Sequence, residues 1–298
     1  MKVLLSGSSG LIGSAIVSQL KKEGHTVSRL VRSKGGAPEE QIIWNPTARI
    51  VDSKGLEGFD AVIHLAGDPI AEGRWTPEKK ANIRDSRVKG TRLLTEALAR
   101  LSQPPKTFLC ASAVGFYGDR GDELLNEESP AGAGFLPETG IEWEQACRPA
   151  AEGGIRVVNL RFGIVLSKNG GALKKMLPPF LLGLGGKLGS GKQWMSWISL
   201  PDAAGAVAHA LADESLRGPV NLVAPNPVTN ADFTKGLGKA LRRPTFALVP
   251  SFAVRMMFGE MADAALLAST RVEPKKLKSS GYRFRHPDLE PALKELLA

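Results

Sequence analysis

The stretch KVLLSGSSGLIGSAIVSQLKKEG, at residues 2–24, joins an apolar run to a glycine-rich loop and an amphipathic segment. Lys2–Ser6 is apolar enough for a buried strand. Leu11–Lys22 repeats apolar residues at helical spacing, which predicts a helix with one buried face. Three glycines stand between the two segments in the pattern G-x-x-G-x-x-G: Gly7, Gly10 and Gly13. The stretch therefore predicts a strand, a tight glycine loop and a helix in direct succession.

Each glycine of this loop has a physical reason to be there. Gly7 permits the tight turn, Gly10 lets a pyrophosphate approach the backbone, and Gly13 lets the helix pack close to the strand. The helix N-terminus adds free N–H groups and a partial positive charge. In this setting the loop predicts dinucleotide binding, and a purely structural turn is the alternative.

The end of the second predicted strand, Thr26–Val31, indicates which dinucleotide is bound. An acidic residue at this point would hold the ribose hydroxyls of NAD. The sequence instead continues with Arg32, Ser33 and Lys34, which place a cation where a 2′-phosphate would lie. The pattern favours NADP as cofactor, and a solvent-facing arginine is the alternative.

Strands and helices alternate along the first half of the chain. Further strands are predicted at residues 41–44, 60–66, 107–113 and 156–160, and helices at residues 78–100 and 137–150. This alternation is typical of right-handed βαβ units. It predicts an α/β fold in which residues 1–165 form a Rossmann domain with a doubly wound parallel sheet.

The amino-acid composition changes after Leu166. Residues 169–192 are rich in glycine and contain Pro178 and Pro179, so mostly loop with one short helix is expected there. We predict that residues 166–298 form a smaller α+β domain that covers the substrate. Within it, a helix and a strand in residues 202–224 are expected to return to the Rossmann domain.

Composition and charge exclude several classes of protein. The 298 residues are 43% apolar and 23% charged, which is ordinary for a globular chain. No apolar run is long enough to cross a membrane, and no basic run interleaved with aromatics suggests nucleic acid. Two cysteines and four scattered histidines do not suggest a metal site, and the low cysteine count suits a reducing, cytoplasmic location.

The net charge of +9 points instead to a small anionic partner. Residues 153–201 hold seven lysines and arginines and no acidic residue. This segment is interpreted as a wall facing an anionic ligand, with a solvated basic face as the alternative.

Further motifs follow successive predicted strands: HLAG at His64–Gly67, ASAVGFYG at Ala111–Gly118 and LRFG at Leu160–Gly163. Longer matching stretches include GDPIAEGRWTPEKKANIRDSRVKGT and GGALKKMLPPFLLGLGGKLGSGKQWMSWI. Together they resemble the extended short-chain dehydrogenase/reductase family, and within it the epimerase-family, sugar-nucleotide-epimerase-like proteins. The resemblance covers nearly the whole chain and implies an NADP-binding Rossmann domain with a small C-terminal domain.

The resemblance also implies roles for particular residues. The pyrophosphate would be held by Gly7, Ser9, Gly10, Leu11, Ile12 and Gly13. Arg32 and Ser33 would face the 2′-phosphate, and the adenine-ribose side would be lined by Leu65, Ala66 and Gly67. Gly163 and Ile164 would pass near the nicotinamide. Arg87 replaces the asparagine of the family's Asn-x-x-Gly-Thr and is counted with the cofactor-binding residues.

The chain departs from the family at the proton relay. Short-chain reductases use a Tyr with a Lys four residues later, and the ammonium lowers the pKa of the phenol. The only tyrosines here, Tyr117 and Tyr282, are followed at that spacing by Gly121 and His286. In the corresponding segment, Gly140 stands at the tyrosine position and Glu144 at the lysine position. The usual relay is therefore absent.

Three polar residues remain as candidates for catalysis: Ser112, Tyr117 and Glu144. Ser112 lies at, or one residue from, the family's catalytic serine, and we expect it to donate a hydrogen bond to a substrate oxygen. Glu142 competes with Glu144, but two helical positions separate them and at most one should face a pocket. The alternatives are a serine bonded to backbone and a tyrosine packed in a loop.

The predicted function is an NADP(H)-dependent oxidoreductase or epimerase-like protein. Its substrate would be small and anionic, either nucleotide-linked or phosphorylated, and a monomer or homodimer is expected. The missing Tyr–Lys pair supports an alternative from another class, an NADP-binding regulator or sensor without turnover. The sequence does not decide between an enzyme and a regulator.

Overall fold

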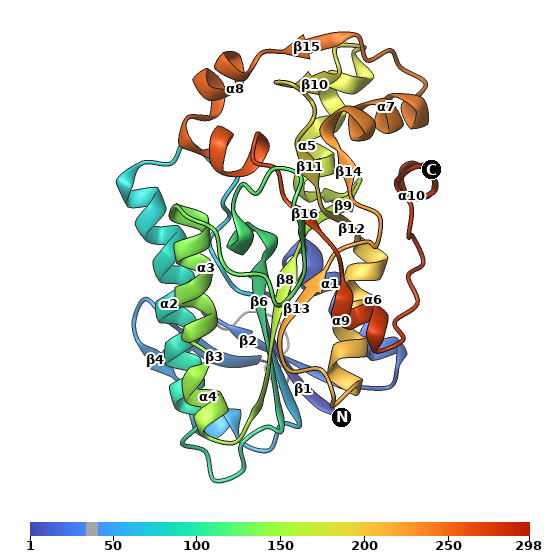
Figure 1. Cartoon of the computed structure of the whole chain (residues 1–298). Helices are drawn as coiled ribbons and strands as arrows, with labels where there is room; N and C mark the ends of the chain where they lie inside the picture. Colours follow the sequence, from blue (N-terminus) through green and yellow to red (C-terminus); the bar gives the residue numbers. More distant parts are fainter. Residues whose placement is uncertain (34–40) are drawn as a thin grey trace.

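In the computed structural model, which describes residues 1–33 and 41–298, eight strands form one central sheet in the order β13-β8-β6-β5-β1-β2-β3-β4 (Figure 1). Its strands are β1 (Lys2–Ser6), β2 (Thr26–Val31), β3 (Gln41–Asn45), β4 (Ile50–Val51), β5 (Ala61–His64), β6 (Thr107–Ala113), β8 (Arg156–Phe162) and β13 (Gly218–Leu222). The pairs are parallel, apart from the antiparallel pair of β3 and β4.

The strand order reverses at β1. From β1 the chain builds outward through β2 and β3, and then returns to add β5, β6, β8 and β13 on the other side. This confirms the predicted doubly wound Rossmann fold. In such sheets a crevice opens at the carboxyl ends of the strands where the order reverses, and this predicts a ligand site beside β1 and β5.

Helices cover both faces of the sheet (Figure 1). One face carries α1 (Leu11–Lys22) and α6 (Leu200–Ala212); the other carries α2 (Pro77–Leu98), α3 (Phe135–Gln145) and α4 (Arg148–Glu152). The core between these layers is apolar, since Val3, Leu4 and Leu5 of β1 are fully buried, as are Ile16 and Leu20 of α1. Burial of this α1 face is the outcome that the spacing of residues 11–22 predicts.

The predicted single helix at residues 137–150 is wrong. The structure has two helices there, α3 and the short α4, with a break after Gln145. Pro149 lies in the first turn of α4. Proline has no N–H to donate to the preceding turn but is well suited to a helix start, so the chain begins a new helix at this point.

The region after residue 163 leaves the sheet and returns to it. Its elements are β9 (Ile164–Ser167), α5 (Gly171–Leu181), β10 (Gly186–Leu188), β11 (Trp194–Met195), β12 (Trp197–Ser199), β14 (Val228–Thr229), α7 (Asn230–Leu241), β15 (Ala247–Val249), α8 (Ser251–Phe258), β16 (Arg271–Val272), α9 (Lys275–Ser279) and α10 (Leu289–Leu297). Short turns of other types are η2 (Lys54–Leu56), η3 (Val114–Tyr117) and η4 (Ala262–Leu266), and β7 (Leu124–Leu125) pairs with β16. The helix α5 is longer than the short helix expected, and it contains Pro178 and Pro179.

Two of these elements belong to the central layers. β13 pairs in parallel with β8, and α6 packs against α1. The upper part of the molecule has its own apolar cluster, which includes Leu173, Trp197 and Phe233. A separate core of this kind is what a smaller second unit needs for its stability.

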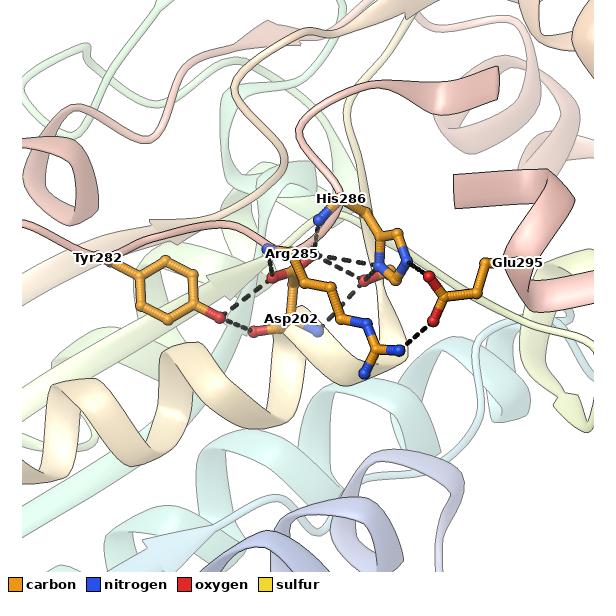
Figure 2. Close-up of polar contacts among 6 residues, drawn as sticks. Asp202, Tyr282, Arg285, His286 and Glu295 are labelled. Carbon is orange, nitrogen blue, oxygen red and sulfur yellow. Dashed lines mark hydrogen bonds and ion pairs between the residues drawn. The ribbon is translucent and has the colours of Figure 1, made fainter. Parts of the chain in front are cut away.

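The C-terminal segment is fixed to the start of α6 by a buried polar cluster (Figure 2). Asp202, which is 2% exposed, accepts hydrogen bonds from the backbone N–H groups of Arg285 at 2.7 Å and His286 at 2.9 Å. The His286 ring in turn contacts Ser199 Oγ through Nδ1 at 2.9 Å and Glu295 Oε2 through Nε2 at 3.0 Å. This cluster therefore ties the approach to α10 to the central layers of the fold.

Candidate functional site

The glycine loop lies at the carboxyl end of β1 and opens α1. Gly7 has φ of +70°, a conformation that favours glycine, and a Cβ on Gly13 would lie 2.1 Å from the Gly7 carbonyl oxygen. These two glycines are required by the backbone itself. Gly10 is different, because a Cβ there would meet only the Gly7 oxygen, at 3.4 Å, among the described atoms.

Gly10 is also the N-cap of α1, and no described side chain caps this helix end. The first N–H groups of the helix are therefore left free at an open surface, beside the exposed Ser9. An uncapped helix N-terminus with room for a close approach fits the diphosphate of a dinucleotide. Leu11, Ile12 and Gly13 supply N–H groups at this end.

The end of β2 carries the residues predicted to select the cofactor. Arg32 and Ser33 are both exposed, and Arg32 makes no ion pair with any residue in the described ranges. Lys34, the third member of the predicted group, lies outside the described residues. A guanidinium at the end of the strand next to β1, with no ion-pair partner among the described residues, suits a phosphate group.

The other predicted wall of the cofactor site follows β5. The Ser6 hydroxyl accepts hydrogen bonds from the backbone N–H groups of Leu65 at 3.1 Å and Ala66 at 3.3 Å. This side chain of β1 thereby fixes the start of the loop after β5. The backbone of Leu65 also lies 3.0 Å from a Cβ built on Gly7, so the two predicted walls are in close contact.

Arg87 of α2 holds the same loop in place by hydrogen bonding and packing. Its Nη1 donates to the carbonyl oxygens of Asp68 at 2.9 Å and Ile83 at 3.0 Å. A Cβ on Gly67 would lie 3.3 Å from the Arg87 guanidinium carbon, so the side chain packs directly against this glycine. Burial lowers the pKa of Arg87 to about 10. The structure thus shows Arg87 shaping the loop that is predicted to line the adenine-ribose side.

The predicted nicotinamide end follows β8. A Cβ on Gly163 would lie 2.6 Å from the Ser196 carbonyl oxygen, which requires glycine at the crossing. Ile164 N–H donates to the same oxygen at 2.8 Å. Gly163 and Ile164 therefore join the segment that leaves the sheet to the strand β12 that brings the chain back toward it.

The three candidate catalytic residues meet in one buried network. Ser112 Oγ donates to Glu144 Oε1 at 2.8 Å, and Arg161 donates to both Glu144 oxygens at 2.7 and 2.8 Å. Arg161 Nη1 also donates to the Tyr117 hydroxyl at 2.9 Å. That hydroxyl donates to Asn221 Oδ1 at 2.8 Å. The network links β6, η3, α3, β8 and β13.

Sequence reasoning missed Asn221 and, at the centre of this network, Arg161. Its guanidinium lies 3.6 Å from the centre of the Phe116 ring and is 4% exposed. Burial raises the pKa of the Tyr117 phenol, and the nearby Arg161 charge only partly opposes this. The available signal was an arginine at an inward position of a buried strand, since such a charge needs a partner in the fold.

The two positions predicted for the missing Tyr–Lys pair, Gly140 and Glu144, make other contacts. A Cβ on Gly140 would lie 3.4 Å from Phe116, so an aromatic ring packs over this helix position. Glu144, at the lysine position, is held by Arg161. Glu142 instead pairs with Arg84 at the surface, at 2.6 Å, so Glu144 is the inward-facing member of the two glutamates.

Few hydrogen-bond donors of the network remain free for a substrate. Ser112 is 3% exposed and Tyr117 is fully buried, and each hydroxyl already donates a hydrogen bond within the network. The structure therefore brings the three predicted residues together, but in a closed arrangement. Ala113, the next residue of β6, is exposed.

Within residues 1–33 and 41–298, His, Cys, Asp and Glu side chains form no group of three or more that could hold a metal ion. Over those ranges, the helices are too short or too polar to cross a bilayer.

Comparison with known proteins extends these observations. The sequence pattern of the NAD dependent epimerase/dehydratase family matches residues 3–222, and a domain of unknown function matches residues 249–296. The chain is 46% identical to the epimerase family protein Mb2239 of Mycobacterium bovis, over 98% of this chain and 96% of that protein.

Solved structures give the same result. The crystal structure of human epimerase family protein SDR39U1 (isoform 2) with NADPH superimposes with a TM-score of 0.92 at 36% identity, and covers 99% of both chains. The UDP-N-acetylglucosamine 4-epimerase of Bacillus cereus shares the fold, with a TM-score of 0.77 at 20% identity over 99% of this chain and 98% of that one. The resemblance inferred from the motifs is confirmed, and the chain belongs to the NAD dependent epimerase/dehydratase family.

Proposed function

We propose that this chain binds NADP(H) across the carboxyl ends of β1, β2 and β5 and acts as an NADP(H)-dependent oxidoreductase of the epimerase type. The observation that carries the proposal is the uncapped N-terminus of α1, where Gly10 leaves space for a diphosphate. Arg32, which follows β2 directly, would contact the 2′-phosphate. The NADPH in the human relative's structure supports the same cofactor.

NADP(H) would supply or accept a hydride at the nicotinamide ring. The chain's own contribution is to hold the diphosphate on the glycine loop and the adenine-ribose side against Leu65, Ala66 and Gly67. Residues 166–298 would cover the nicotinamide end, with Gly163 and Ile164 as the passage between the two units. Arg156 and Arg161 are bonded inside the fold, but the five exposed lysines of the acid-free residues 153–201 support a small anionic substrate, nucleotide-linked or phosphorylated.

Ser112 is proposed as the hydrogen-bond donor to the substrate oxygen. Its hydroxyl points at Glu144, so it must rotate away from that carboxylate to reach a substrate. Glu144 would keep both hydrogen bonds from Arg161 during this rotation. Tyr117 and Glu144 are the second and third candidates for proton transfer.

One observation favours a different function, that of an NADP-binding regulator or sensor without turnover. Every polar candidate beside the predicted nicotinamide end is committed to the closed network of Ser112, Glu144 and Arg161. A protein that only reports the NADP(H) state needs no free proton donor.

The proposal includes a cytoplasmic location. Both cysteines are free thiols, which suits a reducing compartment.

Two measurements test the proposal. Calorimetric titration should show tighter binding of NADPH than of NADH; absence of binding would overturn the cofactor assignment. Single-turnover oxidation of bound NADPH, with a panel of carbonyl compounds and nucleotide sugars, then separates enzyme from regulator. Ser112→Ala should slow this step by about 10²–10⁴-fold, as expected when a catalytic proton donor is lost. Tight binding with no oxidation by any compound would support the regulator.

The variants Tyr117→Phe and Glu144→Gln complete the test. If wild type oxidises NADPH and all three variants match its rate, the assignment of catalytic residues is wrong.

A further inference from the structure

One end of the molecule, formed by β15, α8 and the loop after α5, exposes several large apolar side chains (Figure 1). The most exposed of them, Phe246, is 94% exposed. The group, called the apical surface here, consists of side chains that are each more than half exposed: Leu182, Leu184, Phe246, Leu248, Phe252 and Met256. Single exposed apolar residues are common, but a contiguous group is typical of a contact with a protein or a membrane.

The apical surface is continuous across three segments of the chain. β15 pairs in parallel with β10, so Leu184, two residues before β10, lies beside the residues that lead into β15. A Cβ on Gly183 would lie 3.8 Å from Pro244 Cγ, which brings the loop that carries Leu182 against the same residues. β15 then continues through Pro250 directly into α8. The six side chains therefore stand on adjoining segments.

The strand β15 has one packed face and one bare face. Phe246 and Leu248 are exposed, whereas Thr245, Ala247 and Val249, which alternate with them, are partly buried. Successive side chains of a strand point to opposite faces of the sheet. The large apolar residues of this strand are therefore on the face that the rest of the fold leaves open.

The helix α8 repeats this arrangement with helical spacing. Phe252 and Met256 lie four residues apart, which puts them on one face of the helix, and both are exposed. Val254, which does not share that face, is fully buried. α8 is thus anchored by its inner side and presents apolar groups outward beside β15.

The charge around the apical surface is positive. Residues 233–259 hold five lysines and arginines and no acidic residue, and Leu182 and Leu184 belong to the acid-free residues 153–201. Arg242 and Arg243, which lie between α7 and β15, are exposed. Neither arginine makes an ion pair with another residue of the described ranges. Two guanidinium groups therefore accompany the apolar side chains.

Charge complementarity indicates what covers this surface. The next carboxylates along the chain, Glu260 and Asp263, are already paired with Lys80 and Arg255. A second copy of the chain, docked about a two-fold axis, would bring the same arginines together without carboxylates to pair them. An anionic bilayer supplies both of the required properties, since its headgroups are negative and the region beneath them is apolar.

We propose that the apical surface binds to the face of a lipid bilayer that carries anionic headgroups. Phe246, Leu248 and Phe252 would enter between the headgroups, while Arg242 and Arg243 would pair with the lipid phosphates. Such contact involves one leaflet and needs no membrane-spanning helix. The inference does not depend on NADP binding or on turnover.

The test measures sedimentation of the full chain with lipid vesicles at low salt. Vesicles of phosphatidylglycerol and phosphatidylcholine in equal parts should bind the protein, and vesicles of phosphatidylcholine alone should bind it at least about tenfold more weakly. The double variant Phe246→Ser/Leu248→Ser should weaken binding to the anionic vesicles about tenfold or more, because two apolar side chains are no longer buried. The double variant Arg242→Gln/Arg243→Gln should have a similar effect, because two charges near the headgroups are lost.

Two control variants exclude general attraction of a basic protein to an anionic vesicle. Ile50→Ser removes an apolar side chain of β4 that is about as exposed as Leu248, and Arg100→Gln removes an exposed charge after α2. Both positions lie away from β15 and α8 (Figure 1), so vesicle binding should be unchanged in both. The melting temperature of each variant shows that it is folded.

The outcomes separate the possible occupants. No binding to anionic vesicles, or the same affinity in Phe246→Ser/Leu248→Ser as in the wild type, overturns the proposal. Equal weakening by the control variants also overturns it, because binding would then depend on overall composition. Sedimentation without lipid shows whether the chain is a dimer. A dimer that Phe246→Ser/Leu248→Ser converts to a monomer would assign the surface to a second copy and overturn the membrane contact.

Discussion

Arg161 holds Glu144 through two hydrogen bonds, of 2.7 and 2.8 Å, at a depth where only 4% and 13% of the two side chains are exposed. The two residues come from β8 and α3. The pair includes Glu144, which the sequence predicts to stand at the lysine position of the absent Tyr–Lys pair. Its burial has a direct consequence for stability, because one partner alone would be an uncompensated buried charge.

Glu144→Gln should therefore destabilise the protein strongly. We expect a loss of about 3–5 kcal/mol in the free energy of unfolding, measured by urea denaturation. Glu142→Gln is the matched control, since Glu142 makes a similar bidentate pair with Arg84 at the surface. That change should cost less than about 1 kcal/mol. Equal losses in the two variants would show that burial of the Arg161 pair is not important.

The glycine loop predicts opposite results for two neighbouring alanine substitutions. Gly10→Ala should leave the melting temperature of the ligand-free protein unchanged, because its Cβ meets no close atom and φ is −74°. It should weaken NADPH binding about tenfold or more, because the methyl group occupies the diphosphate's approach. If the ligand-free Gly10→Ala protein unfolds, the glycine is structural.

Gly13→Ala should instead reduce the stability of the ligand-free protein. Its Cβ would lie 2.1 Å from the Gly7 oxygen, so α1 must move away from β1. Overpacking of this kind costs about 3 kcal/mol or more of stability. Differential scanning calorimetry of the ligand-free protein measures this, and an unchanged melting temperature would contradict the close packing.

Arg32 is expected to set the choice between cofactors. Arg32→Asp removes the charge that would meet a 2′-phosphate and adds a carboxylate that can bond ribose hydroxyls. The ratio of NADPH to NADH affinity should fall at least about tenfold, since a charge-assisted hydrogen bond is lost. Titration calorimetry with both cofactors measures the ratio, and Arg32→Gln separates the lost charge from the added one. Equal loss for both cofactors would exclude Arg32 as the discriminating residue.

His64 should make the protein less stable in mild acid. It is fully buried between Trp44 and Phe108, and burial lowers its pKa from 6.5 to about 4. The unfolded chain therefore binds a proton that the folded chain excludes between these two pH values. Stability is full above pH 6.5 and declines as the pH falls to about 4, by about 3 kcal/mol.

The corresponding measurement is the unfolding free energy as a function of pH. His64→Asn removes the titrating ring and can keep a polar contact to Ser6, which lies 2.7 Å from Nδ1. This variant is expected to be less stable at every pH but to lose His64's contribution to the slope. The same slope in both proteins would assign the acid sensitivity to other groups.

Features with local causes were predicted well from the sequence. α1 begins at Leu11 and ends at Lys22, as the spacing of its apolar residues predicts, and it follows the glycine loop directly. The glycine loop and the alternation of strands and helices also follow from short motifs and periodicity. In each case the deciding residues lie within a few positions of one another.

The polar contacts between distant segments could not be predicted in this way. Arg161 forms hydrogen bonds with Glu144, which lies 17 positions earlier in the chain, and with Tyr117, which lies 44 positions earlier. Asp202 accepts a hydrogen bond from His286, which lies 84 positions later. The residues around each charged group do not indicate which distant group will be its hydrogen-bond partner. Partners of this kind are set by strand register and helix placement, which depend on the whole fold.

The return of β13 to the sheet also bears on how the chain can be divided. Residues 1–165 alone would leave β8 as an edge strand, with unpaired N–H and C=O groups along the line where β13 lies. They would also lack α6 and so uncover an apolar face of α1. Such a fragment would tend to self-associate edge to edge. Residues 1–165 therefore do not make a unit that can be moved alone into another protein. A fusion or domain exchange would need to carry residues 200–222 with it.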